Sequence, residues 1–396
     1  MKNIKLRHIL DCHPIVRSDI ISGKNTDLYS NDGKKIVDFE AGMWCTALGH
    51  SNLRINTVMI EQLEKIMNTH YKLTCNIAEV LAANLLQQFH FQDGKAVFLS
   101  SGSEAVELSI RISKLISEKN KVLTFSTSYL SAFSNTSIPR DKNMWNEIDF
   151  LQCSKCQNKE CTNKCSILED IRFEDVSTFI LEPGSSSGRV IFPPYKLVKF
   201  LADEVKKYGG SIVINEVTTG LGRTGKWFGY NYYDLKPDIV ALGKSLGNGY
   251  PISAVVMDKK IAEQVEKNKF SYAQSHQNDP LGCVIANEVI NIMKEEKIIE
   301  RSKNTGEFFF NQLWEIQNSS PIVKEVRGRG LMLALELNIN NVTEIIAEKM
   351  LEKGYFIGTT PAWNVLRFYP ALTISENDIS SMCETLKHII RQFENV

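Results

Sequence analysis

The chain has 396 residues, 43% of them hydrophobic, and its 46 basic and 46 acidic residues give a formal net charge of zero. Such a chain can bury one large core and a smaller satellite, and it lacks the basic excess that favours nucleic acid or an anionic membrane surface. No apolar run approaches the ~20 residues of a membrane span, and nine cysteines, an odd number, suit a reducing compartment better than a disulfide framework. We therefore expect a cytoplasmic protein with neither nucleic acid nor membrane as a partner.

From about residue 95 to residue 255, short β-rich segments alternate with helical patterns. One helix is predicted over residues 103–118, where Ser101 and Glu104 have the spacing of a capping box. A second helix is predicted over residues 195–208. This alternation is typical of an α/β domain with a mostly parallel sheet. The predicted strands are Ala96–Leu99, Val122–Phe125, Ser177–Leu181, Ser211–Ile214 and Asp238–Leu242.

Polar residues follow each of these five strands within a few positions. Ligands of open α/β sheets bind in the crevice outside the carboxyl ends of the strands. We therefore expect these polar groups to converge on one pocket. They are Ser100–Ser103, Tyr129, Glu182, Asn215 and Lys244.

Beyond about residue 285 the pattern changes to a helix over residues 285–301, a strand over residues 331–337, and further helices. This favours a smaller α+β domain at residues 285–396, to which an N-terminal segment, residues 1–45, contributes. The large domain then spans residues 46–284 and contains a cysteine-rich insert at residues 150–166.

Lys244 lies in ALGKSLGNGYP, directly after an apolar strand. A lysine in this place is expected to be largely desolvated, which lowers its pKa and exposes a nucleophilic amine that can form a Schiff base. The alternative is an ordinary lysine at the end of a strand whose amine reaches water.

Several segments, in order and over nearly the whole length, resemble the class III aminotransferases, a family of fold type I enzymes that depend on pyridoxal 5'-phosphate. The resemblance implies a large domain with a mostly parallel sheet, a smaller α+β domain, and a homodimer with shared active sites. It also implies a small-molecule amino donor and a keto acid or aldehyde acceptor. The segments are SSGSEAVELSIRISK, FILEPG, NEVTTGLGRTGKWFG, KPDIVALGKSLGNGYPISAVV, SHQNDPLG and NVLRFYPALTI.

The resemblance also implies roles around the cofactor. Lys244 is expected to form the Schiff base and to move the proton on the substrate carbon. Gly102 and Ser103 are expected to bind the phosphate at a helix N-terminus, and Tyr129 to stack on the pyridine ring. Ser275 matches the family's threonine that reaches the phosphate from the neighbouring subunit. Glu182, in the EP segment, completes the expected cofactor site.

The resemblance places Arg367 and Trp44 at the substrate. Arg367 matches an arginine that clamps a carboxylate by a bidentate pair, and Trp44 lies where relatives line the substrate pocket. Many relatives pair this arginine with a glutamate five residues after the position of Glu182. Here that residue is Ser187. We therefore expect Arg367 to be unpaired and ready for an α-carboxylate.

Asn215 departs from the family pattern, which has an aspartate facing the pyridine nitrogen. An asparagine can donate a hydrogen bond to an unprotonated nitrogen but supplies no counter-charge. Three interpretations follow: an aminotransferase, a racemase, epimerase or aminomutase of the same fold, or a non-catalytic protein that binds pyridoxal phosphate or metal. We favour the aminotransferase.

The insert holds four cysteines within 13 positions, in the spacing Cys-x2-Cys-x4-Cys-x3-Cys. Lys155, Lys159 and Lys164 lie among them and are expected to favour thiolates. This pattern indicates a metal site, zinc ahead of iron–sulfur, with free or redox-active thiols as the alternative. The expected ligands are Cys153, Cys156, Cys161 and Cys165.

Overall fold

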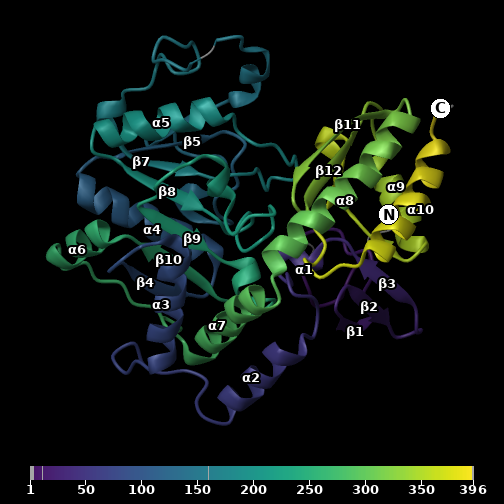
Figure 1. The fold of residues 1–396 in the computed structure, drawn as a ribbon, viewed down its shortest axis with the longest axis horizontal. Helices are drawn as coiled ribbons and strands as arrows, with labels where there is room; N and C mark the ends of the chain where they lie inside the picture. Colours follow the sequence, from purple (N-terminus) through teal and green to yellow (C-terminus); the bar gives the residue numbers. More distant parts are fainter. Residues whose placement is uncertain (1–3, 11, 159, 395–396) are drawn as a thin grey trace.

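The computed structural model of the chain describes residues 4–10, 12–158 and 160–394. Within these residues the largest sheet has seven strands in the order β4-β10-β9-β8-β7-β5-β6 (Figure 1). Pairing is parallel from β9 to β6, whereas β10 pairs antiparallel with both β4 and β9. The strands are β4 (Lys95–Leu99), β5 (Lys121–Phe125), β6 (Trp145–Ile148), β7 (Val176–Leu181), β8 (Ser211–Asn215), β9 (Ile239–Leu242) and β10 (Ser253–Met257).

Helices cover both faces of this sheet. Alternate residues of a single strand pack against the helices of opposite faces. Val213 of β8 packs into a cluster with α4 and α6, whereas its neighbours Ile212 and Ile214 pack into a cluster with α3, α5 and α7. Every residue of β7 and β8 is buried, as expected for parallel strands covered on both faces. The helices are α3 (Asn76–Phe89), α4 (Gly102–Ser117), α5 (Tyr195–Lys207), α6 (Lys259–Lys267) and α7 (Pro280–Glu295).

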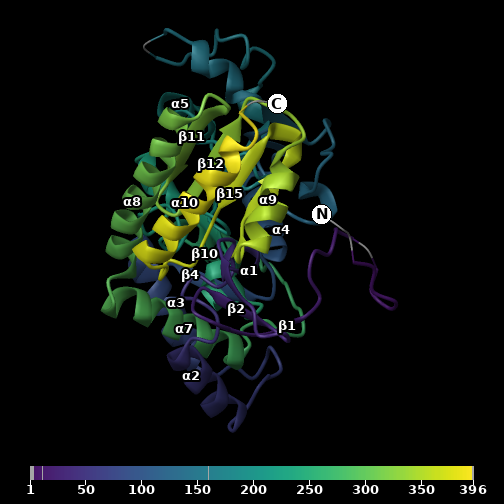
Figure 2. The same ribbon diagram turned by 90° about the vertical axis from the view of Figure 1, so that its right-hand side faces the viewer.

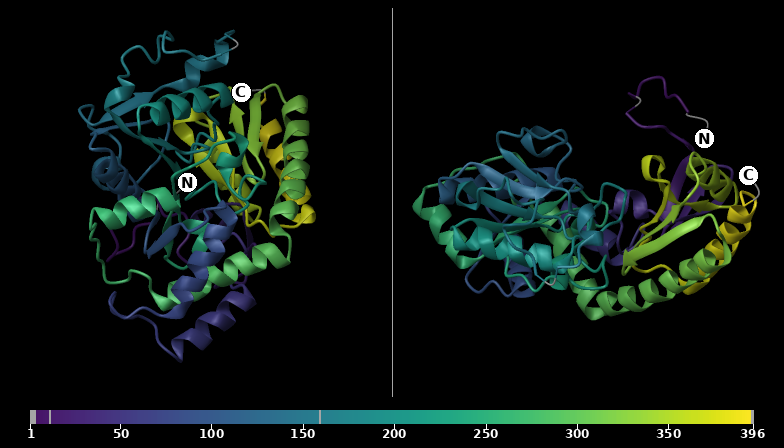
Figure 3. Two further views of the ribbon diagram at one scale, coloured as in Figure 1. Left: turned by 60° about the vertical axis from the view of Figure 1, so that its left-hand side comes forward. Right: turned by 90° about the horizontal axis from the view of Figure 1, so that it is seen from above.

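The rest of the molecule is built from both ends of the chain. Two further four-stranded sheets occur in the described part, β1-β2-β3-β13 and β11-β12-β15-β14 (Figures 2 and 3). The short parallel pairing of β13 with β3 joins the C-terminal segment to the N-terminal one. The elements are β1 (Ile20–Lys24), β2 (Asp27–Ser30), β3 (Lys35–Asp38), α1 (Ala41–Trp44), α8 (Ile298–Ser319), β11 (Val323–Arg329), β12 (Met332–Leu337), α9 (Thr343–Glu352), β13 (Tyr355–Phe356), β14 (Gly358–Thr360), β15 (Val365–Phe368) and α10 (Glu376–Arg391). Helix α2 (Leu53–Leu63) instead packs on α7 of the large part, where Arg54 pairs with Glu288.

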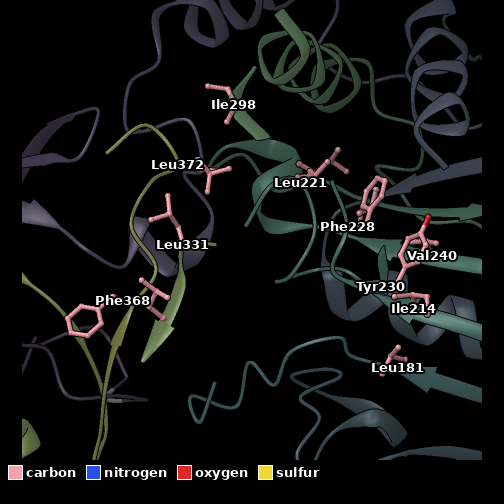
Figure 4. Packing of buried hydrophobic residues seen from close by; sticks show 14 of the residues in the cluster. Leu181, Ile214, Leu221, Phe228, Tyr230, Val240, Ile298, Leu331, Phe368 and Leu372 are labelled. Carbon is pink, nitrogen blue, oxygen red and sulfur yellow. The ribbon is translucent and has the colours of Figure 1, made fainter. Parts of the chain in front are cut away.

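One buried hydrophobic cluster extends from the large sheet into this second part (Figure 4). It contains Ile214 and Val240 of the large sheet. It also contains Leu331, which directly precedes β12, and Phe368, which lies on β15. Burial of apolar side chains contributes roughly 25 cal/mol per Å² removed from water. The cluster therefore holds the two parts in a fixed relation, which fixes Arg367 on β15 relative to the ends of the parallel strands.

The predicted α/β class and all five predicted strands are confirmed, with ends that differ by one residue at most. The capping box at the start of α4 is confirmed, because Glu104 N donates to Ser101 Oγ at 3.2 Å and Ser101 N donates to Glu104 Oε2 at 2.9 Å.

The single helix predicted over residues 285–301 is wrong. The chain instead forms α7 and α8, which are separated at Lys297, where φ is +50°. A left-handed residue cannot continue a right-handed helix. Strands β6 and β10 were not predicted.

Candidate active site

A cavity of about 450 Å³ lies at the carboxyl ends of the parallel strands. Loops that follow β4, β5, β7, β8 and β9 form most of its wall, which is the arrangement expected from the polar residues that end these strands. The segment around α1 and strand β15 close the other side. The lining residues are His13, Met43, Trp44, Gly102, Ser103, Tyr129, Leu130, Ser186, Ser187, Asn215, Val217, Thr218, Lys244 and Arg367.

Lys244 begins the short 3-10 turn that follows β9, and its φ of +44° directs the chain away from the sheet. Its Nζ donates to Thr218 Oγ1 at 2.7 Å and lies 4.5 Å from the centre of the Trp44 ring. Burial lowers the pKa of Lys244 to about 8. The predicted desolvation of this amine is therefore confirmed.

Both polar backbone groups of Tyr129, its N–H and its carbonyl, are hydrogen-bonded to side chains. Its N–H donates to Glu182 Oε2 at 3.0 Å, and its carbonyl accepts from Asn215 Nδ2 at 3.1 Å. The side-chain oxygen of Asn215, Oδ1, accepts from Val217 N at 3.2 Å. The polar end of β8 thus positions the loop that carries the Tyr129 ring into the cavity.

Glu182 lies behind this loop rather than in the cavity wall. It is 3% exposed, and it accepts from Ser186 N at 3.2 Å as well as from Tyr129 N. Burial raises the pKa of Glu182 to about 7, against the opposing effect of these hydrogen bonds. Its direct contacts are with the protein, so it acts on the cavity through Tyr129 and Ser186.

The N-terminus of α4 faces the cavity at Gly102 and Ser103. A Cβ on Gly102 would lie 2.6 Å from Val217 Cγ1, so this close approach requires glycine. Ser103 Oγ accepts from Ala132 N at 3.0 Å. Unpaired backbone N–H groups at a helix N-terminus suit an anion such as a phosphate.

Ser275 does not line this cavity in the described chain. Its side chain is exposed, and its carbonyl accepts from Asn68 Nδ2 at 3.1 Å.

The expectation that Arg367 is unpaired is wrong. Arg367 Nε donates to Glu40 Oε1 at 3.2 Å and Nη2 donates to Glu40 Oε2 at 2.7 Å, which is a bidentate pair. Ser187 indeed supplies no charge, but Glu40, just before α1, supplies the carboxylate instead. Burial raises the pKa of Glu40, whereas the Arg367 guanidinium lowers it.

Trp44 connects the two cationic groups of the cavity. Its ring lies 4.5 Å from Lys244 Nζ and 4.9 Å from Arg367 Cζ, and its Nε1 donates to Glu40 Oε2 at 3.1 Å. The ring is 5% exposed and packs edge-on against Tyr369. It therefore lies both in the cavity wall and in the core.

Among the residues of the site that were not predicted, Glu40, Thr218 and His13 carry polar groups that bear on its chemistry. Glu40 carries a charge within the apolar stretch IVDFEAGMW, and this is a signal of a buried ion pair. Thr218 lies in the segment NEVTTG, beside the predicted Asn215. We find no sequence signal for His13.

In the cysteine-rich insert, the expectation of thiolates is wrong for Cys153 and Cys161. Burial raises the pKa of Cys153 to about 11, and Cys161, Cys165 and Cys156 raise it further. Burial also raises the pKa of Cys161. Of the neighbouring lysines, Lys159 and the side chain of Lys155 lie outside the described residues. Among the described His, Cys, Asp and Glu side chains, no group of three or more is arranged to hold a metal ion.

The model of the family described as aminotransferase class-III matches residues 13–390. The chain belongs to the class-III aminotransferase family. It is therefore an aminotransferase that depends on pyridoxal phosphate, and its fold is the fold type I of that family, as predicted.

Relatives support this assignment over nearly the whole chain. The chain is 29% identical over 380 residues to an acetylornithine aminotransferase from Aquifex aeolicus, covering 93% of this chain and 96% of the relative. It is 26% identical over 384 residues to a [LysW]-aminoadipate semialdehyde/glutamate semialdehyde transaminase from Sulfurisphaera tokodaii, covering 95% of each. The fold matches that of a Bacillus anthracis aminotransferase with a TM-score of 0.88 at 23% identity, covering 98% and 96% of the two chains. None of the described helices combines the length and apolarity needed to cross a membrane.

The cavity of this class-III aminotransferase fits pyridoxal phosphate. Gly102 and Ser103 line the cavity at the N-terminus of α4, where a phosphate would fit, and Tyr129 supplies an aromatic ring. Lys244 supplies an amine within the same cavity. The cavity therefore offers an anion site, an aromatic ring and a nucleophilic amine, which are the three features that the cofactor requires.

We expect the apoprotein to react with pyridoxal phosphate at a rate that follows the unprotonated fraction of Lys244. Because the pKa of Lys244 is about 8 rather than the ordinary 10.5, the rate should rise with pH and reach half its maximum near pH 8. Stopped-flow absorbance checks this, with Lys244→Arg as the unreactive control. A rate that still climbs about tenfold per pH unit at pH 10 would contradict the lowered pKa.

Proposed function

We propose that the enzyme moves an amino group between an amino acid or amine donor and a keto acid or aldehyde acceptor, with Lys244 as the central residue. The observation that carries this proposal is the amine of Lys244, which is held by Thr218 inside the cavity with its pKa lowered to about 8. Bound pyridoxal phosphate supplies an aldehyde that condenses with amines and a ring that accepts the electron pair released at the substrate carbon.

The residues around the cavity have distinct roles in this proposal. Lys244 would take the proton from the substrate Cα and deliver it to the carbon on the other side of the substrate nitrogen, because a base with a pKa near 8 is effective at neutral pH. Tyr129 packs on the ring, while Gly102 and Ser103 bind the phosphate. Ser275 reaches the phosphate from the partner subunit, in keeping with its exposed position outside this chain's own cavity.

Substrate is received between Lys244 and Arg367, next to Trp44. All three residues line the cavity, and the Trp44 ring lies within 5 Å of both cations, at 4.5 and 4.9 Å. Trp44 therefore narrows the space for the substrate carbon chain.

A half-reaction tests the aminotransferase proposal. On adding an amino donor without acceptor, we expect the aldehyde form of the holoenzyme to convert to the pyridoxamine form, and a keto acid or aldehyde to restore it. Absorbance spectra measure both steps, and Lys244→Ala should slow them by at least about 10²-fold, since general base catalysis contributes 10²–10⁴. Solvent deuterium entering the donor without conversion to the pyridoxamine form would instead indicate a racemase.

We propose that Asn215 faces the pyridine nitrogen, where the family pattern has an aspartate. The geometry around β8 supports an amide here, because Nδ2 donates to the Tyr129 carbonyl at 3.1 Å. A carboxylate oxygen in its place would face that carbonyl without a hydrogen between them. The amide thus fixes Tyr129 but supplies no negative charge to hold a proton on the nitrogen.

For Asn215→Asp we expect a change in the cofactor absorbance and faster removal of the substrate proton, by about fivefold. The reason is that a charge-assisted hydrogen bond exceeds a neutral one by about 1 kcal/mol. Stopped-flow spectra measure the rate of this proton removal, with ordinary substrate and with substrate that is deuterated at the reacting carbon. Asn215→Ala, which loses the contact with Tyr129 and adds no charge, is the matched control. Identical spectra and rates for wild type and Asn215→Asp would contradict the proposed position.

We propose a homodimer in which each active site receives residues of both subunits. We also propose that each chain divides into a large domain, residues 46–284, and a small domain, residues 285–396, and that residues 1–45 contribute to the small domain. The pairing of β13 with β3 supports the placement of both chain ends in one unit. A cytoplasmic location stays a prediction from the cysteine content.

We propose that the four-cysteine insert binds zinc, or an iron–sulfur cluster, after a local rearrangement. The support is the mutual proximity of the thiols, since Cys156, Cys161 and Cys165 each act on the pKa of Cys153. Elemental analysis of protein purified anaerobically should find about one zinc or a stoichiometric amount of iron per chain. Cys153→Ser with Cys161→Ser should remove it, whereas Cys283→Ser should not. Metal-free wild-type protein that is fully active and equally stable would contradict the site.

A further inference from the structure

We propose that Arg189, stacked on Trp363 at the edge of the cavity, binds a carboxylate at the far end of the substrate. The substrate class is then an amine or amino acid whose carbon chain leads out of the cavity to a terminal carboxylate. This inference rests on the proposed function, because the amine at the other end of such a substrate is the group that reacts beside Lys244.

The Trp363 ring fixes the plane of the Arg189 guanidinium. Arg189 Cζ lies 3.8 Å from the centre of this ring, and Trp363 is 46% exposed. A guanidinium that stacks on an aromatic face keeps its N–H groups at its edge, where they can still donate. The pair therefore presents an oriented edge of donors beside an exposed aromatic ring.

The pair lies next to the cavity, between two chain segments that line it. Ser187, two residues before Arg189, is part of the cavity wall. Between them, Gly188 has a φ of +90°, and a Cβ there would lie 2.9 Å from Arg367 Nη1. Trp363 belongs to the turn between β14 and β15, the strand that carries Arg367. Arg189 and Trp363 are not among the described lining residues, so they lie at the edge of the cavity rather than inside it.

A row of contacts leads from the Lys244 amine to this edge. The Trp44 ring lies 4.5 Å from Lys244 Nζ and 4.9 Å from Arg367 Cζ. Arg367 Nη1 lies 3.5 Å from Thr360 Oγ1, which donates to the Gly188 carbonyl at 2.9 Å. The residue after Gly188 is the proposed carboxylate site. A substrate whose amine meets Lys244 can therefore extend past Trp44 to that site.

Arg189 supplies a charge that no described carboxylate neutralises. The carboxylates of the neighbouring elements pair with other arginines, since Glu336 Oε2 lies 2.7 Å from Arg327 Nη1 and Glu40 pairs with Arg367. The planar fork of an arginine matches the two oxygens of a carboxylate, and charge-assisted hydrogen bonds are roughly twice as strong as neutral ones. A terminal carboxylate is therefore the group that this edge recognises best.

The backbone at Arg189 is already held in place. Its carbonyl accepts from Arg327 Nε at 3.1 Å and from Arg327 Nη2 at 2.8 Å. The next side chain, Val190, is buried in a cluster with Trp44. Binding therefore has little backbone to order, and this lowers the entropic cost of holding the carboxylate.

Matched pairs of amines test the inference on the holoenzyme. The pairs are ω-aminohexanoate with hexylamine and ω-aminooctanoate with octylamine, which differ only in the terminal carboxylate. Stopped-flow absorbance of the cofactor gives an apparent Kd for each amine. We expect at least one carboxylate to bind about tenfold more tightly than its alkylamine, and Arg189→Gln to bring this ratio close to one. The preference should also weaken as the salt concentration rises.

Further variants separate the charge from its position. Arg189→Lys keeps the charge but lacks the planar fork, so it should retain only part of the preference. Trp363→Ala keeps the charge and releases the guanidinium from the ring, and it should lower the ratio about threefold. This variant keeps the test decisive if Arg189→Gln folds poorly. Arg172→Gln is the matched control, because it removes an exposed arginine beside the amino end of β7 and should leave the ratio unchanged.

The failure of this inference is distinguishable from the failure of the proposed function. Wild-type holoenzyme whose cofactor absorbance responds to no amine or amino acid contradicts the proposed function. Wild-type holoenzyme that responds, but with ratios within about twofold of one for both pairs, contradicts the role of Arg189 alone. A clear preference that Arg189→Gln leaves unchanged contradicts that role as well.

Discussion

Desolvation of the Lys244 amine is the constraint on which the rest of the site depends. An ordinary lysine is protonated at neutral pH and is neither a nucleophile nor a base. Here the buried strand β9 brings the chain to the cavity, and the turn at Lys244, with φ of +44°, directs the side chain beside Thr218 and Trp44. Burial then lowers the pKa to about 8. A fold whose sheet is covered on both faces by helices is what makes such burial possible.

The second charged group, Arg367, is positioned by a different part of the molecule. It lies on β15, and its partner Glu40 comes from the segment between β3 and α1. Because the Trp44 indole donates to Glu40 and its ring lies against Lys244, the ion pair and the amine share one wall. The packing of the two parts of the molecule therefore sets the position of Arg367 relative to Lys244.

The sequence predicted most of the large sheet because its strands are short apolar segments that end in polar residues. The same pattern predicted that Gly102, Tyr129, Asn215 and Lys244 converge, since the carboxyl ends of parallel strands meet at one edge. It did not predict β6 or β10. The break between α7 and α8 was also missed, because the left-handed residue is Lys297 rather than the glycine that usually marks a helix end.

The pairing of Arg367 was the most consequential error. Its partner lies 327 residues earlier in the chain, and no local spacing connects them. The absence of a charge at Ser187 was correctly noted, but the inference that Arg367 is free assumed that no other carboxylate approaches. The thiolate prediction failed at Cys153 for a similar reason, since burial raises the pKa of this thiol. Pairwise distances and burial are properties of the tertiary structure, and sequence patterns carry little information about them.

The most direct test of the central role of Lys244 is to reduce the holoenzyme with borohydride and locate the pyridoxyl group by peptide mass spectrometry. The account predicts one label per chain, on the peptide that contains Lys244, and loss of the free amine at that residue. A label on another lysine, or no label at all in protein that binds the cofactor, would contradict it.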